Sequence, residues 1–302
     1  MFKVRQNDLI GLFNRINSKS WVKRSGILKL HFLAIITVIS LFMGVTIINA
    51  QNGERLYVSS FGGNQVLEYN GMTGSFIDVF AQGVVNDLDG PLDTAFGPDG
   101  NIYVTSFGTD QVLQYNGTTG ELIDVFVTAG SGGLNQPEGL IFGPDDNLYV
   151  ISEGTREVLR YDGTTGAFID VFVTSGSGGL MVPVGLTFGP DDNLYVNSHL
   201  VNGVFRYDGT TGAFIDIFVT AGSGGLSLPE GLSFGPDGNL YVSSRVTDQV
   251  IRYNGTTGAF IDIFVTAGSG GLDDPFGFTF GPDDNLYVTS FGTDQVIRYN
   301  GT

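Results

Sequence analysis

The stretch PEGLIFGPDDNLYVIS occupies residues 137–152, and close copies of it return along the chain at a fixed distance. Its tyrosine belongs to the segment [LI]-Tyr-Val, which recurs every 46 residues. This tyrosine stands at Tyr57, Tyr103, Tyr149, Tyr195, Tyr241 and Tyr287. The turn G-P-D-[GD] keeps the same step from Gly97 to Gly281. A period of about 40 to 50 residues that contains several short strand patterns is typical of a propeller blade.

One repeat divides into four predicted strands. In the unit that starts at Pro137, the predicted strands cover 137–142, 148–152, 158–161 and 168–172. The turns between them carry Pro, Asp, Asn and Gly, which preset φ or tolerate the left-handed conformation. After residue 50, apolar residues nowhere hold a helical period over three turns. The sequence therefore predicts an all-β propeller of about six four-stranded blades.

The strand count predicts that the first or last blade is incomplete. The first predicted strand of the repeat region is a second strand, 56–58, and the last is a third strand, 296–299. This gives six second and six third strands but only five first and five fourth strands, or 22 where six full blades need 24. A truncated sequence is favoured over a native open ring. An open ring would expose strand edges that invite pairing between chains.

Residues 1–50 differ from the repeats and are expected to be a secretory signal or a signal anchor. They hold seven of the 14 basic residues and one acid, and an apolar run at 32–48 precedes Ala50. A basic segment, an apolar segment and a small residue predict a signal peptide cut after Ala50. The alternative is an uncleaved anchor, in which residues 30–48 would be the only contact with a membrane. Both interpretations place the propeller, residues 51–302, outside the cytoplasm.

The composition of residues 51–302 excludes some partners. This part contains 30 acidic residues, seven arginines and no lysine, which is a formal charge of −23. Such a field repels phosphate backbones, so nucleic acid is not an expected partner. The chain has no cysteine, so neither disulfides nor a lipid anchor on cysteine can form.

The pattern P-x-G-[LI]-x-F-G-P-D-[GD]-N-[LI]-Y-V-x-S resembles the repeat of the NHL and streptogramin-lyase-like propellers, which are grouped with the gluconolactonase-like and TolB-like six-bladed propellers. The resemblance covers residues 51–302 and implies a fold that carries lyases, lactonases and adaptors without chemistry. The streptogramin lyases pair a His directly after the first-strand proline with a Glu fourteen residues later. Here those positions hold Glu138 and Ser152, Val184 and Ser198, or Glu230 and Ser244. The lyase activity is therefore not carried over.

Two variable columns of the repeat are expected to meet at one rim of the ring, because the start of a first strand neighbours the end of a second strand. The position after the second-strand serine reads Phe61, Phe107, Glu153, His199, Arg245 and Phe291. The position after the first-strand proline reads Leu92, Glu138, Val184, Glu230 and Phe276. Carboxylates, an imidazole and a guanidinium beside aromatic rings could bind a ligand. The candidate ligand site therefore comprises Glu138, Glu153, His199, Glu230, Arg245, Phe61, Phe107 and Phe291, with unconstrained drift at an exposed rim as the alternative.

These residues favour a secreted, non-catalytic binding or scaffolding module for an unknown protein or small molecule, without catalytic or metal-ligating residues. His199 is the only histidine after residue 50, so a multi-histidine metal centre is excluded. The second hypothesis is a metal-dependent lactonase or lyase that uses Glu138, Glu153 or Glu230 with His199, and a divalent cation such as Ca²⁺. Asn197 is the one amide near the rim that could assist. A third hypothesis is a structural spacer.

Two further patterns make local predictions. Asp170, Asp216 and Asp262 on fourth strands are expected to pair with Arg160, Arg206 and Arg252 on the neighbouring third strands. Residues 86–90 followed by Asp93 faintly resemble a calcium loop but lack its bidentate glutamate. An acidic turn is the favoured interpretation of that segment.

Overall fold

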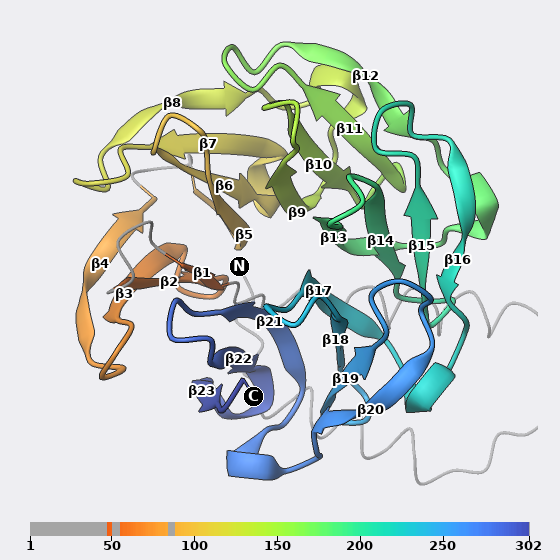
Figure 1. The fold of residues 1–302 in the computed structure, drawn as a ribbon. Helices are drawn as coiled ribbons and strands as arrows, with labels where there is room; N and C mark the ends of the chain where they lie inside the picture. Colours follow the sequence, from red (N-terminus) through yellow and green to blue (C-terminus); the bar gives the residue numbers. More distant parts are fainter. Residues whose placement is uncertain (1–46, 50–54, 84–87, 302) are drawn as a thin grey trace, which may run out of the picture. The chain divides into compact units, whose positions relative to one another are not determined.

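The computed structural model describes residues 47–49, 55–83 and 88–301, with only the backbone at 47–49 (Figure 1). The predicted leader falls almost wholly on 1–46 and 50, outside these residues, and its cleavage stays a prediction. All described residues belong to one compact unit, Met43–Thr302. No helix in the described part has the length and apolar character needed to span a bilayer.

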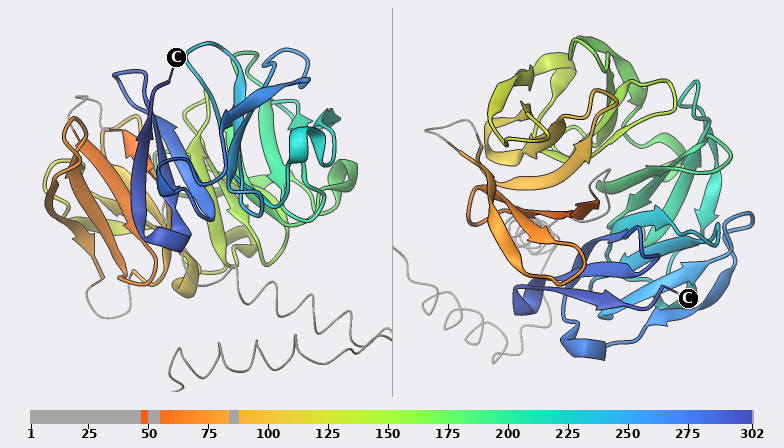
Figure 2. Two further views of the ribbon diagram at one scale, coloured as in Figure 1. Left: turned by 90° about the horizontal axis from the view of Figure 1, so that it is seen from below. Right: turned by 60° about the vertical axis from the view of Figure 1, so that its left-hand side comes forward.

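Six antiparallel sheets stand in a ring and form a six-bladed β-propeller (Figures 1 and 2). The first strands lie innermost: β1 (Ile47–Asn49), β5 (Pro91–Phe96), β9 (Pro137–Phe142), β13 (Pro183–Phe188), β17 (Pro229–Phe234) and β21 (Pro275–Phe280). The second strands are β2 (Arg55–Ser60), β6 (Ile102–Ser106), β10 (Leu148–Ser152), β14 (Leu194–Ser198), β18 (Leu240–Ser244) and β22 (Leu286–Ser290). Strand alternation and Gly-Pro-Asp turns thus place the strands as the repeat predicts.

The outer half of each blade holds the third and fourth strands. The third strands are β3 (Gln65–Asn70), β7 (Gln111–Tyr115), β11 (Glu157–Tyr161), β15 (Gly203–Tyr207), β19 (Gln249–Tyr253) and β23 (Gln295–Tyr299). The fourth strands are β4 (Phe76–Gln82), β8 (Leu122–Val127), β12 (Phe168–Val173), β16 (Phe214–Val219) and β20 (Phe260–Val265). Short 3-10 turns are η2 (Phe107–Thr109), η3 (Ser131–Gly133), η4 (Ser177–Gly179), η5 (Ser223–Gly225), η6 (Ser269–Gly271) and η7 (Phe291–Thr293).

The structure corrects the predicted count of 22 strands to 23 within the described residues. Residues Ile47–Asn49, which the sequence pattern placed in the leader, pair with β2 and supply the first strand of blade one, so the predicted cut after Ala50 would remove this strand. This strand, β1, contacts both β5 and β21, so it lies between the first strands of blades two and six. Within the described residues, blade six consists of β21, β22 and β23, one strand fewer than each of the other blades.

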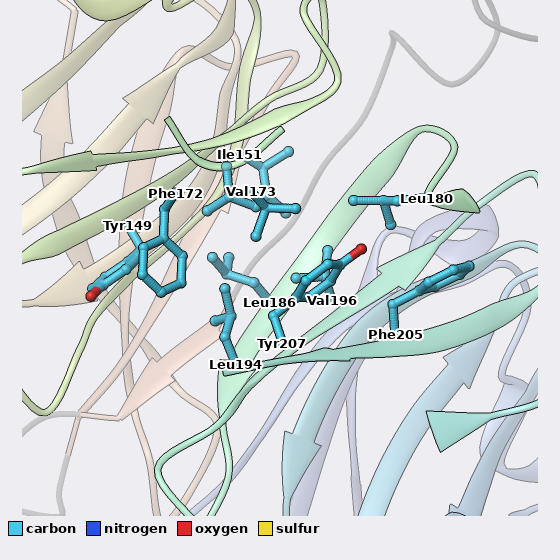
Figure 3. Close-up of a cluster of buried hydrophobic side chains, with 11 residues drawn as sticks. Tyr149, Ile151, Phe172, Val173, Leu180, Leu186, Leu194, Val196, Phe205 and Tyr207 are labelled. Carbon is cyan, nitrogen blue, oxygen red and sulfur yellow. The ribbon is translucent and has the colours of Figure 1, made fainter. Parts of the chain in front are cut away.

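The core consists of seams between neighbouring blades. At the seam of blades three and four, Tyr149 and Phe172 pack toward Leu186 and Tyr207 of the next blade (Figure 3). The Tyr149 ring meets Phe172 edge-on at 4.8 Å and Phe188 at 5.0 Å between centroids. Because the repeat step is constant, the same tyrosine sits between the same two phenylalanines at each seam from blade one to blade five.

The predicted pairs between third and fourth strands are confirmed. The guanidinium groups of Arg160, Arg206 and Arg252 each donate twice to an aspartate on the neighbouring strand. The shorter contact is 2.6 Å in all three pairs. These partly exposed pairs contribute a few tenths to about 1 kcal/mol each.

Candidate ligand site at the channel mouth

The predicted meeting of two columns at one rim follows from the strand register. Pro137 lies opposite Ser152, Pro183 opposite Ser198, and Pro229 opposite Ser244. The residue after each proline therefore lies beside the residue after each serine. The serine hydroxyl accepts a backbone N–H from the segment that enters the blade, as Asn135 N does with Ser152 Oγ at 3.0 Å. These serines fix the segment that enters the blade to the end of the second strand. The variable residues follow directly after them in the sequence.

Arg245 joins two carboxylates at this rim. Its Nη1 lies 3.3 Å from Oε1 of Glu230, and its Nη2 donates to Oδ2 of Asp274 at 3.2 Å. The guanidinium lies 5.4 Å from the centroid of Phe276 and 5.7 Å from that of Phe291. Burial opposes the charge, but Asp274 and Glu230 outweigh it and raise the pKa of Arg245. Arg245 is thus a fixed cation of the site.

His199 approaches the same glutamate from the neighbouring blade. Its Nε2 lies 3.2 Å from Oε1 of Glu230. Both side chains are buried, His199 with 6% and Glu230 with 2% of its surface exposed. Glu230 therefore stands between an imidazole and a guanidinium.

Glu138 and Glu153 are carboxylates in an unfavourable environment for charge. Burial, followed by the negative charges of Glu153 and Glu230, raises the pKa of Glu138 well above its usual range. Burial also raises the pKa of Glu153, which His199 opposes. Groups with shifted pKa values that gather in a concave site are typical of functional sites.

Three atoms of this cluster are buried and lack a hydrogen-bond partner among the described residues. They are Oε2 of Glu138, Oε2 of Glu230 and Nε2 of His199, whose approach to Oε1 of Glu230 at 3.2 Å lacks the angles of a hydrogen bond. Leaving a buried polar atom unpaired costs about 1–3 kcal/mol, and more for a charged group. Such atoms are rare unless a ligand or water completes them.

The cluster borders the central channel. A cavity of about 220 Å³ is lined by first strands of blades two to six, and both Glu138 and Glu230 contribute to its wall. Glycines in the P-x-G segments allow these strands to approach closely. A Cβ on Gly185 would lie 2.4 Å from the carbonyl oxygen of Glu230.

The eight predicted site residues do not form one contiguous set of contacts among the described residues. Short contacts join Glu230 to His199 and to Arg245. Charge interactions connect Glu138 and Glu153 with Glu230. Phe291 joins them through Arg245. Phe61 and Phe107 contact each other, with centroids 6.2 Å apart, and no described contact links them to the acids.

Two residues of the site were not predicted from the sequence. Asp274 forms the second ion pair of Arg245, beside the one with Glu230. Asp93 lines the channel and accepts the backbone N–H of Thr94 at 2.7 Å and of Leu140 at 2.9 Å. Asp93 occupies the column that holds Gly139, Gly185, Gly231 and Gly277 in blades three to six. That break in a uniform column was the available signal.

The donor set does not fit a divalent cation. Among the described residues, no group of three or more His, Cys, Asp or Glu side chains is arranged to hold a metal ion. Asn197 is not free to help, because its Oδ1 accepts Gly185 N at 2.8 Å and its Nδ2 donates to the carbonyl oxygen of Glu230. The guanidinium of Arg245 already pairs with Oε1 of Glu230. In the segment predicted to be an acidic turn, Asn86 and Asp87 lie outside the described residues, and Asp93 binds backbone N–H groups.

Comparisons with known proteins identify a shared fold. No protein-family model matches the chain, and no curated protein matches it. Solved structures do match. A catalytically inactive virginiamycin B lyase from Staphylococcus aureus, with quinupristin, superposes with a TM-score of 0.60 at 16% identity, over 87% of this chain and 86% of that one. A streptogramin B lyase structure gives a TM-score of 0.60 at 16% identity, over 86% and 84%.

A gluconolactonase from Xanthomonas campestris gives a TM-score of 0.65 at 19% identity, over 83% of this chain and 84% of that one. The chain shares the six-bladed propeller fold of these enzymes. At identities of 16–19% the likeness concerns the backbone architecture, and one architecture carries many activities.

Proposed function

We propose that this propeller is a secreted, non-catalytic binding module whose channel mouth binds a small polar ligand. The observation that carries the proposal is the set of buried, unpaired atoms on Glu138, His199 and Glu230 beside a channel cavity. A ligand that pairs with these atoms would remove their desolvation cost, which is a direct source of affinity. The extracellular location rests on the predicted leader.

The charges at the mouth favour a ligand that brings hydrogen-bond donors. The carboxylates are Asp93, Glu138, Glu153, Glu230 and Asp274. Arg245 is the fixed cation beside them and is already paired twice. An anion would meet these acids, whereas an amine or a polyol would donate to them. We therefore propose an amine or a polyol as the ligand class.

Thermal melting of the full chain tests this proposal. Cadaverine represents the amines, glucitol the polyols, and glutarate is the anionic control. A ligand at one hundred times its Kd adds about 2.7 kcal/mol to the free energy of unfolding. We expect stabilisation by a donor-rich probe in the parent, none in a Glu138→Gln, Glu230→Gln variant, and the parent response in Glu121→Gln, whose side chain is exposed.

Binding of the amine is expected to strengthen as the pH rises through the pKa of Glu138, because the carboxylate form accepts the ammonium donor. Stabilisation by glutarate alone, or equal responses in parent and double variant, would contradict the proposal.

The second candidate is a metal-dependent lactonase or lyase. Its support is that the structural neighbours are named as enzymes of these classes. The poor fit of the donor set to a cation speaks against it. Melts with Ca²⁺, Mg²⁺ or EDTA separate the two functions: a metal-dependent rise that a Glu138→Gln, Glu153→Gln, Glu230→Gln variant loses, together with turnover of a lactone, would establish the enzyme. Indifference to metal with no response to any probe would leave the spacer.

A further inference from the structure

The three unpaired buried atoms at the channel mouth can all accept a hydrogen bond. Oε2 of Glu138 and Oε2 of Glu230 belong to carboxyl groups, and an ionised carboxylate only accepts. Nε2 of His199 accepts in the neutral tautomer that carries its proton on Nδ1. A ligand group that satisfies all three atoms therefore needs three donors and no acceptor.

These atoms belong to one group of interacting side chains. Nε2 of His199 lies 3.2 Å from Oε1 of Glu230, without the angles of a hydrogen bond. The charge of Glu230 acts on the carboxyl groups of both Glu138 and Glu153. Arg245, the cation beside them, is already paired twice. A further cation bound among these acids would favour their ionised forms, which are the forms that accept.

A primary ammonium group matches this set of acceptors. It carries a positive charge, three N–H donors and no acceptor. A hydroxyl group brings one donor together with two lone pairs, so a polyol would turn some of its lone pairs toward the carboxylates. A trimethylammonium group keeps the charge but has no donor. The mouth therefore favours a primary amine over a polyol.

Below the mouth, polar groups of the channel wall pair with one another. The backbone N–H of Gly185 donates to Oδ1 of Asn197 at 2.8 Å, and that of Gly231 donates to Oγ of Ser243 at 2.8 Å. Both carboxyl oxygens of Asp93 accept backbone N–H groups. This part of the wall thus leaves few polar atoms for a ligand.

Apolar side chains form much of the remaining wall. One column of the repeat lines the cavity with Leu140, Leu186, Leu232 and Phe278. This column follows the column of Glu138 and Glu230 by two residues, which is roughly 7 Å along a strand. Thr94 holds the column in blade two, and its Oγ1 lacks a hydrogen-bond partner among the described residues. The channel therefore presents carboxylates at its mouth and a largely apolar wall below them.

Resting on the proposed function, we propose that the ligand is a primary alkylamine. Its ammonium group donates to Glu138, Glu230 and His199, and its alkyl chain extends along the apolar wall of the channel. The cavity has a volume of about 220 Å³. Since an apolar cavity of about 150 Å³ holds benzene, a chain of several carbons fits. Hydrogen bonds would thus select the head group, and apolar burial would select the chain.

Calorimetric titration of the full chain at about pH 8 tests the chain, because an amine is charged and a histidine is neutral there. Pentylamine is the main probe. We expect it to bind at least about fivefold more tightly than cadaverine, whose second ammonium would lie against apolar side chains. Shortening the chain stepwise to methylamine should weaken binding by up to about fourfold for each methylene group removed.

Trimethylpentylammonium tests the head group, since it keeps the charge and the chain. It should bind at least about tenfold more weakly than pentylamine, because the three acceptors stay unpaired. A Glu138→Gln, Glu230→Gln variant should lose pentylamine binding, with circular dichroism as the check of its fold. Glu121→Gln, whose side chain is exposed, should keep the affinity of the parent.

The outcomes distinguish the alkylamine from the broader binding function. Cadaverine or glucitol binding at least as tightly as pentylamine, in the parent and not in the double variant, would overturn the alkylamine and leave the binding module. Equal affinity for trimethylpentylammonium, or equal affinities along the chain-length series, would also overturn it. Absence of saturable binding by pentylamine, cadaverine and glucitol alike would overturn both proposals.

Discussion

Asp93 replaces the glycine of its column and brings a carboxyl group into the channel wall. Burial raises the pKa of Asp93 to about 7, and hydrogen bonds from Leu140 and Thr94 oppose this. In the unfolded chain the pKa of an aspartate is about 3.9. Between these values the folded protein holds a proton that the unfolded chain has lost. The stabilising contribution is complete below pH 4 and is lost as the pH rises to about 7.

Asp93→Gly, which introduces the residue found at this position in blades three to six, should therefore flatten the pH dependence of stability. We expect the parent to lose more unfolding free energy than the variant between pH 4 and 8, by an amount of up to about 4 kcal/mol. Urea unfolding at several pH values measures this difference. Glu153 and Asp274 titrate in both proteins, whereas Asp93 contributes to the raised pKa of Glu138, so the difference measures Asp93 together with its effect on Glu138. Parallel pH profiles would refute the assignment.

Arg245 is the residue on which the ion-pair network depends. Arg245→Met should destabilise the fold by about 3 kcal/mol, because Glu230 and Asp274 would be left without their cation in a buried site. Adding Glu230→Gln should recover about 1 kcal/mol, because one of the unpaired charges is then removed. Denaturant unfolding of the four proteins of this cycle gives the coupling energy. Strict additivity would show that the two side chains act independently.

At the scale of elements, the 3-10 turn that precedes a blade packs against a phenylalanine on the fourth strand of that blade, as Gly178 does against Phe214. Gly176 and Gly178 both have positive φ, +77° and +63°. A Cβ on Gly176 meets nothing within 4 Å, whereas one on Gly178 would lie 2.2 Å from the ring of Phe214. Gly176→Ala should cost about 1 kcal/mol for backbone strain alone. Gly178→Ala should cost about 1–3 kcal/mol more, because the ring must move.

The two alanine variants form their own control, since they differ in the steric contact and share the backbone conformation. Thermal and urea unfolding compare them. Equal losses would mean that Phe214 shifts freely and that the turn does not position β16.

The repeat allowed the strands to be predicted closely, because alternation and turn residues act locally. The expected strands at 137–142 and 148–152 coincide with β9 and β10. The first strand of blade one was missed, because Ile47–Asn49 follows an apolar run that resembles a leader and lacks the P-x-G pattern. Asn197 shows the other limit: its sequence position placed it near the rim, but only the structure shows that it binds backbone groups of two first strands.

At the scale of the whole molecule, the site could be predicted as a list of columns but not as a set of contacts. Its residues lie on several blades, and the ring brings together side chains that are far apart along the sequence, such as Glu138 and Glu230. Whether His199 reaches Glu230, or Phe61 reaches either, depends on side-chain directions around a closed channel. The exact repeat placed the residues at the rim, and the inward direction of each side chain required the structure.

The ring should open first at the seam of blades six and one. At the other seams a tyrosine packs between two phenylalanines, and a fourth strand covers the third strand of the blade. The seam after blade six lacks both features among the described residues. Since local opening follows the density of buried contacts, amides of 295–299 should exchange with deuterium faster than those of 249–253, the same strand one blade earlier. Mass spectrometry of both segments in one experiment provides the comparison. Equal protection would show that β23 is as stable as β19 without a described fourth strand beside it.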